Sequence, residues 1–114
     1  MVGQKQTTNN GLNITFIKIG SGKIPKIRDK VRCDYVLKQK DGTEIDSSYV
    51  RGNSIVFAAD EVIEGLREAL LIMPTGSKVN LVIPPDLAYG AEGVYPHIKP
   101  NETLLYEVVL HSIE

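Results

Sequence analysis

Side chains that could carry covalent or metal-assisted chemistry are few in this sequence. His97 has no nucleophile partner at a recognisable spacing, and His111 alternates with apolar residues in a strand-like segment, which favours a structural role. Ser47 and Ser48 lack the G-x-S-x-G setting of a hydrolase nucleophile. HxxxH, CxxC and acidic-loop patterns are absent, so we expect no metal ion and no cofactor. The sequence therefore argues against hydrolytic, nucleophilic and metal-dependent catalysis.

Isolated polar groups among apolar residues are the remaining candidates for a site. They are Tyr35, Asp46, Arg51, Tyr89 and Tyr106. Asp46 follows the apolar Ile45 in a short strand-like segment, and a carboxylate that is even half buried needs a partner. Tyr35 and Arg51 could supply that partner. A solvated aspartate at the end of a strand is an equally good interpretation of the same pattern.

Alternation of apolar and polar residues predicts the strands that would position these groups. The predicted strands are residues 12–20, 30–39, 43–48, 54–58, 77–84 and 102–114. Asp41-Gly42 joins the second and third of them as a hairpin turn, because glycine accepts a positive φ without a steric penalty. Residues 1–10 are polar and lack periodicity, so we expect a flexible N-terminal leader there.

One helix is predicted, over residues 60–73. Asp60 is suited to cap its start, and Pro74 would end it. Gly65 inside the helix indicates close packing against a sheet. The apolar residues recur at helical spacing and form one stripe: Val62, Ile63, Leu66, Ala69, Leu70 and Met73. A single helix with one apolar stripe favours an α+β fold, in which a curved antiparallel sheet of about five to six strands wraps around one short helix.

The composition is that of one ordinary globular domain, with 114 residues, 42% hydrophobic and 24% charged. A net charge of −1 indicates neither a nucleic-acid footprint nor a basic membrane-binding surface, and no apolar run is long enough to span a membrane. Cys33 is the single cysteine, so an internal disulfide is excluded. The start of the chain lacks the apolar region of a secretory signal. We therefore expect a cytoplasmic monomer, or a periplasmic or other extracytoplasmic location if the sequence is a domain of a longer protein.

Three segments together resemble the FKBP-type (immunophilin) peptidyl-prolyl cis-trans isomerases. They are DGTEIDSS at 41–48, VIEGLREALLIMPTGSKVNLVIPPDLAYG at 62–90 and TLLYEVVL at 103–110. Within that family, the residues of these segments are most similar to the bacterial macrophage-infectivity-potentiator type. The resemblance extends over residues 11–114. The resemblance implies the sheet-and-helix fold for that range. It also implies catalysis of rotation about X–Pro bonds in unfolded or loop segments of other proteins, without covalent chemistry.

The resemblance also implies roles for individual residues. Asp46 and Tyr89 would be catalytic, with Arg51 as the ionic partner of Asp46. In the family, the backbone N–H at the position of Ile63 and the tyrosine hydroxyl at the position of Tyr89 bind ligand carbonyls. The pocket that holds the proline-containing segment would be formed by Tyr35, Ile45, Arg51, Phe57, Val62, Ile63, Leu66, Ile98 and Tyr106.

The sequence departs from the family pattern at the floor of this pocket. Leu66 stands where the family usually has tryptophan, and Ile45 stands where phenylalanine is common. Leucine keeps the pocket apolar but offers no flat surface to a proline ring and no indole donor. We therefore expect weakened binding of the macrolide immunosuppressants rapamycin and tacrolimus. Two hypotheses follow: an isomerase of reduced activity, or a binding and chaperone module of the same fold with little or no turnover.

Overall fold

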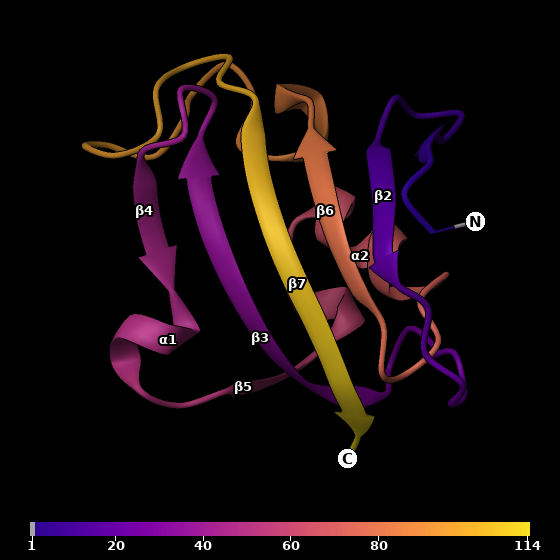
Figure 1. The fold of residues 1–114 in the computed structure, drawn as a ribbon. Helices are drawn as coiled ribbons and strands as arrows, with labels where there is room; N and C mark the ends of the chain where they lie inside the picture. Colours follow the sequence, from indigo (N-terminus) through magenta and orange to yellow (C-terminus); the bar gives the residue numbers. More distant parts are fainter. Residues whose placement is uncertain (1) are drawn as a thin grey trace.

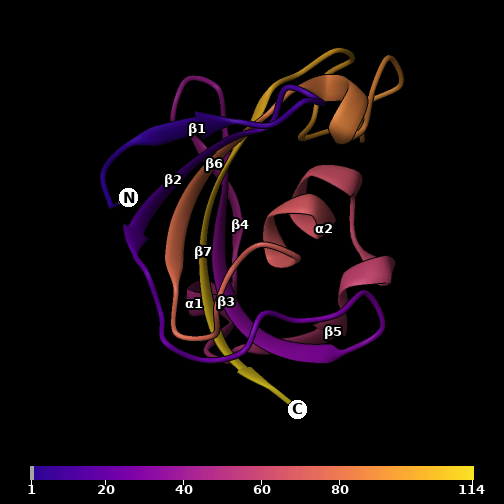
Figure 2. The ribbon, with the colours of Figure 1, turned by 90° about the vertical axis from the view of Figure 1, so that its right-hand side faces the viewer.

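The computed structural model describes residues 2–114, and its main feature is an antiparallel sheet of seven strands (Figure 1). The strand order is β1-β2-β6-β7-β3-β4, and β5 pairs with β3 beside that path. The strands are β1 (Lys5–Thr7), β2 (Asn13–Lys18), β3 (Lys30–Gln39), β4 (Glu44–Ser47), β5 (Ile55–Ala58), β6 (Lys78–Ile83) and β7 (Leu104–Ile113). Seen edge-on, the sheet curves around the principal helix, α2 (Glu64–Leu70), which lies on its concave side (Figure 2). The α+β prediction is confirmed.

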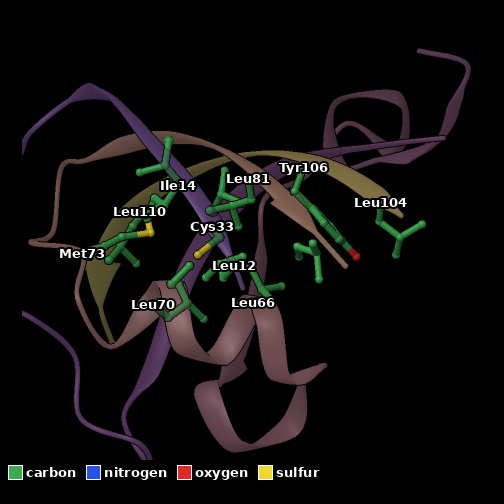
Figure 3. Packing of buried hydrophobic residues seen from close by; sticks show 14 of the residues in the cluster. Leu12, Ile14, Cys33, Leu66, Leu70, Met73, Leu81, Leu104, Tyr106 and Leu110 are labelled. Atoms are coloured by element: carbon green, nitrogen blue, oxygen red, sulfur yellow. The ribbon is translucent and has the colours of Figure 1, made fainter. Parts of the chain in front are cut away.

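The core forms where alternating side chains of the strands meet the apolar stripe of α2 (Figure 3). β7 buries Leu104, Tyr106, Val108 and Leu110, so every second residue faces inward. Gly65 makes the close approach of helix and sheet possible, because a Cβ there would lie only 2.5 Å from Cγ2 of Ile83. Packing therefore explains a glycine that costs the helix about 1 kcal/mol in intrinsic propensity.

The helical region differs from the prediction. Residues Ala59–Glu61 form a 3₁₀ turn, Val62 and Ile63 are extended, and α2 begins only at Glu64. The Glu61 carboxylate accepts the backbone N–H of Ala58 at 2.7 Å, which stabilises the tight turn. Asp60 lies within this turn, so its predicted role as the cap of the helix is wrong. The break leaves Val62 and Ile63 on a short extended link just before the first turn of α2.

Two other segments form elements that periodicity did not predict. Residues 5–7, within the expected leader, pair with β2 as the edge strand β1. Residues 48–51, which start at the end of the predicted strand 43–48, form the single-turn helix α1 (Ser48–Arg51), which Ser47 caps by accepting the Val50 N–H at 3.0 Å. A further 3₁₀ turn, η2 (Pro85–Leu87), follows β6. Within residues 2–114, none of the helices has the length and apolar character needed to cross a membrane.

Candidate functional site

A cavity of about 560 Å³ lies between the sheet and the start of α2. Strands β3, β4, β5 and β7, the link that precedes α2, and the turn after η2 all contribute to it. Its lining residues are Tyr35, Leu37, Asp46, Ile55, Phe57, Glu61, Val62, Ile63, Leu66, Tyr89 and Tyr106. The lining is mostly apolar and aromatic, with a few polar groups, which is the usual make-up of a binding site.

One wall of the cavity carries a hydrogen-bonded group of three side chains. The Tyr35 hydroxyl donates to Oδ2 of Asp46 at 2.6 Å, and the Arg51 guanidinium donates to the same Oδ2 at 2.7 Å. Arg51 also contacts the Tyr35 hydroxyl, and its guanidinium carbon lies 5.7 Å from the centre of the Tyr35 ring. The Asp46 carboxylate therefore has the two partners that the sequence proposed, and its orientation is fixed.

Sheet geometry explains how this group forms. In the β3–β4 ladder Asp46 is opposite Leu37, so Tyr35 is its diagonal neighbour on the same face. Burial of the ring raises the pKa of the Tyr35 phenol to about 12, and the hydrogen bond to Asp46 acts in the same direction. At neutral pH the phenol is therefore protonated and remains a donor to the carboxylate.

The floor and the far side of the cavity are apolar. Leu66 projects from α2 with only 6% of its surface exposed, and Phe57 and Val62 flank the space. Tyr106 is buried on β7, and its ring centre lies 6.1 Å from that of Tyr35 at an interplanar angle of 50°. Burial raises the pKa of the Tyr106 phenol above its ordinary value. A ligand in this cavity would leave water and contact mainly carbon.

The rim offers two hydrogen-bond donors to a ligand. Tyr89, 37% exposed, stands on the turn after η2, and its hydroxyl has no hydrogen-bond partner within residues 2–114. The backbone N–H of Ile63 likewise finds no acceptor in that range, because it precedes the first turn of α2. Both groups border the apolar space, so they could bind carbonyl oxygens of a polypeptide.

Eight of the eleven predicted site residues line the cavity: Tyr35, Asp46, Phe57, Val62, Ile63, Leu66, Tyr89 and Tyr106. Arg51 does not line the cavity, but it is bonded to two residues that do, Asp46 and Tyr35. Ile45 packs against the core beside the cavity, and Ile98 is buried in the core and bridges to Val94. The structure thus does not place these last two residues in the lining.

Three lining residues were missing from the predicted set. Leu37 and Ile55 follow from strand alternation, because each lies two residues from a predicted member, Tyr35 or Phe57, and so faces the same side. Glu61 gave no such signal, since its position depends on the 3₁₀ turn. The described residues hold no group of three or more histidine, cysteine or acidic side chains that could bind a metal ion.

Comparison with known proteins shows the family of the chain. The model of the FKBP-type peptidyl-prolyl cis-trans isomerase family matches residues 21–111, most of the sequence. The chain belongs to this family. A curated FKBP-type relative, the 22 kDa peptidyl-prolyl cis-trans isomerase of Escherichia coli K12, is 46% identical over 107 residues. The Mip isomerase of Coxiella burnetii is 38% identical over 109 residues.

Solved FKBP-type structures agree with this assignment. Escherichia coli FkpA superposes with a TM-score of 0.92 at 42% identity, over 96% of this chain and 51% of FkpA. AtFKBP13 superposes with a TM-score of 0.92 at 30% identity, over 97% of this chain and 99% of AtFKBP13. The alignment with the 22 kDa relative includes 94% of this chain but 52% of the relative. The alignment with the Coxiella Mip includes 96% of this chain but 47% of that protein. The chain thus spans about half the length of these curated relatives.

Proposed function

We propose that this chain, through residues 11–114, accelerates cis-trans rotation about X–Pro bonds in other polypeptides. The observation that supports this most is one apolar cavity that combines the fixed Asp46 carboxylate with donors at the rim on Tyr89 and Ile63. Uncatalysed rotation must cross a barrier of ~18–20 kcal/mol, because the planar amide loses its resonance. No covalent bond has to break, so the reaction needs neither a nucleophile nor a metal ion.

The cavity suits this reaction in two respects. The twisted amide has less charge separation than the planar amide, so an apolar lining that includes Phe57 and Leu66 favours it over the ground state. Donors on Tyr89 and Ile63 would hold neighbouring carbonyls of the substrate in a turn while the bond rotates. In this proposal Asp46 and Tyr89 are catalytic, and the other lining residues bind the proline and its neighbours.

The proposal is tested by measuring the isomerisation rate of a proline tetrapeptide. Wild type, Asp46→Ala, Leu66→Trp and Asp86→Ala are compared in a protease-coupled assay and by NMR exchange spectroscopy. Asp86 is an exposed aspartate on η2 that does not line the cavity, so Asp86→Ala is the matched control. We expect wild-type acceleration above background, a clear loss in Asp46→Ala, a gain in Leu66→Trp and no change in Asp86→Ala.

Other results would contradict the proposal in distinct ways. A wild type that does not accelerate exchange but binds the peptide, while Leu66→Trp gains turnover, would establish the binding and chaperone module instead. Equal activity of wild type and Asp46→Ala would remove the role assigned to the carboxylate. The chain contains no tryptophan, so Leu66→Trp also introduces a single tryptophan in the cavity, whose fluorescence can report binding.

For ligands, we propose proline-containing segments together with weakened binding of rapamycin and tacrolimus. The support is Leu66, which fills the floor with an aliphatic side chain. Titration of wild type and Leu66→Trp with rapamycin, by calorimetry, should give a lower dissociation constant for the variant. Equal constants would show that the floor residue does not limit affinity.

For assembly and location we retain the predictions made from the sequence. We propose a monomer, which light scattering after size-exclusion chromatography would check.

We propose a cytoplasmic location for the chain as given, and an extracytoplasmic one if it is a domain of a longer exported protein. A relative from Legionella longbeachae, 39% identical over 105 residues, is named outer membrane protein MIP, which supports the second case. A compartment-specific reporter fused to the full-length protein would separate the two.

A further inference from the structure

The edge of β3 beside the cavity contains a gap in its strand pairing. β5 pairs with β3 only as far as Cys33, and β4 begins to pair only at Val36. Asp34 and Tyr35 therefore have no strand partner on this side, although β7 continues on the other. A backbone N–H in such a gap needs another acceptor, because an unpaired buried donor is costly.

Ser48 fills this gap with its side chain. It is the first residue of α1 and is fully buried. Its hydroxyl oxygen accepts the Tyr35 N–H at 2.9 Å, and the hydroxyl donates to Oδ1 of Asp34 at 2.6 Å. Oδ2 of Asp34 lies 2.8 Å from Nε2 of His111 on β7. Asp34 thus links the buried hydroxyl to a side chain on the neighbouring strand.

The same serine is connected to the cavity by two routes. Its bond to the Tyr35 N–H holds the Tyr35 backbone in place. The position of that backbone in turn determines where the phenol that donates to Asp46 lies. Ser48 also anchors α1, whose last residue is Arg51, the other partner of Asp46. A shift of Ser48 would therefore move both groups that orient the carboxylate.

We propose that Ser48 and Asp34 are positioning residues, which hold Tyr35 and Arg51 where they orient the Asp46 carboxylate toward the cavity. Neither residue lines the main cavity, so both act through Tyr35 and α1 rather than on the ligand. The proposal rests on the proposed isomerase function for its kinetic consequence, but its structural part can be tested without any turnover.

The kinetic test compares Ser48→Ala, Asp34→Ala and Asp34→Asn with Ser54→Ala. Ser54→Ala is the matched control, because it also removes a partly buried hydroxyl, the acceptor of Arg32 at 3.0 Å, but Ser54 has no bond to Tyr35.

Ser48→Ala and Asp34→Ala should each displace the Asp46 carboxylate by a fraction of an ångström. We therefore expect kcat/KM to fall about three- to tenfold in both variants. Asparagine keeps an acceptor for the Ser48 hydroxyl, so Asp34→Asn should retain most of the activity. Ground-state affinity for the peptide should change by less than about twofold, because the apolar lining is untouched.

A double-mutant cycle with Tyr35→Phe separates positioning from general destabilisation. Because Ser48 acts partly through the Tyr35 hydroxyl, Ser48→Ala should cause a smaller loss in the Tyr35→Phe background than in wild type, since coupled residues are not additive. The loss that remains is the part that acts through α1 and Arg51. A full additional loss, or a loss no larger than that of Ser54→Ala, would overturn the proposal.

NMR supplies the readout that does not depend on activity. The Tyr35 ring signals and the Asp46 carboxyl carbon should shift in Ser48→Ala and Asp34→Ala but not in Ser54→Ala. Absence of these shifts overturns the positioning role. An inactive wild type that still shows them would overturn the proposed function alone. If Ser48→Ala fails to fold, the two Asp34 variants carry the same test.

Discussion

The Tyr35 hydroxyl donates to Oδ2 of Asp46 at 2.6 Å across two paired strands, as diagonal neighbours on one face of the sheet. The carboxylate therefore receives its orientation from the β3–β4 ladder, whereas the ligand-facing donors on Tyr89 and Ile63 come from a turn and a helix start. Because the two halves of the site lie on different elements, they can be altered separately.

Tyr35→Phe should lower kcat/KM while the fold is kept, because phenylalanine preserves the ring but removes one donor to Asp46. We expect a loss of about two- to tenfold, equivalent to one ordinary hydrogen bond of about 0.5–1.5 kcal/mol, because Arg51 still holds the carboxylate. The peptide assay described above measures it, and the thermal midpoint serves as the control for stability. An unchanged kcat/KM would show that Arg51 alone orients the carboxylate.

The Tyr35 phenol should titrate near pH 12 in the folded protein, because burial, and then the hydrogen bond to Asp46, raise its pKa from 10.0 to about 12. A raised pKa stabilises the fold fully below pH 10 and loses that contribution as the pH rises through about 12. Carbon-13 NMR of the ring measures the titration directly. In Asp46→Ala the midpoint should move down toward 10, and no movement would contradict the assigned cause.

Much of the fold followed from the sequence, because strand alternation and the helical stripe record burial directly. Leu104 and Leu110 alternate on β7, and Leu66 and Leu70 share one face of α2. The start of α2, by contrast, depends on the Glu61 carboxylate bonding the Ala58 N–H, and α1 is capped by the Ser47 hydroxyl, which accepts the Val50 N–H. Such contacts between side chain and backbone leave no periodic signal.

For the site, residue types and the family resemblance placed Tyr35, Asp46 and Leu66 at one cavity. They also placed Ile45 and Ile98 there, but in the structure these side chains pack into the protein beside the lining. The difference arises because the backbone path of β4 and of the loop around Ile98 decides which way each side chain turns. Glu61 reaches the cavity for a similar reason, through a turn that residue types alone do not define.

Asp34 should make the protein sensitive to acid. Its pKa lies below the ordinary 3.8, because the Ser48 hydroxyl and then His111 form hydrogen bonds to the carboxylate. A lowered pKa gives a contribution to stability that is present above pH 3.8 and is lost as the pH falls through the pKa of the folded state. Urea unfolding between pH 2 and 6 should therefore show a shallower acid decline for Asp34→Asn than for wild type. Parallel curves would contradict the assignment.

Cys33 should be unreactive in the folded protein. The side chain is fully buried, and burial, followed by the charge of Asp34, raises the pKa of the thiol from 9.0 to about 12. Because the thiolate is the reactive form, labelling by a disulfide reagent at pH 8 should proceed at the rate at which the chain unfolds. The neutral thiol also stabilises the fold below pH 9, and this contribution is lost as the pH rises through about 12. Rapid labelling under native conditions would indicate local opening of β3.

Gly65→Ala should destabilise the protein even though alanine favours a helix by about 1 kcal/mol over glycine. The new Cβ would lie 2.5 Å from Cγ2 of Ile83, so the buried Ile83 side chain, α2 or β6 must shift. Overpacking of this kind costs about 1–3 kcal/mol, which outweighs the gain in helix propensity.

Chemical denaturation of Gly65→Ala, Ile83→Ala and the double variant measures the change in the free energy of unfolding. The two costs should be less than additive, because Ile83→Ala removes the atom that the new methyl group meets. Since Leu66 follows Gly65 and forms the cavity floor, a displaced α2 should also change the affinity for a proline peptide. A stabilised Gly65→Ala variant with unaltered affinity would show that helix propensity, and not the contact with Ile83, decides this position.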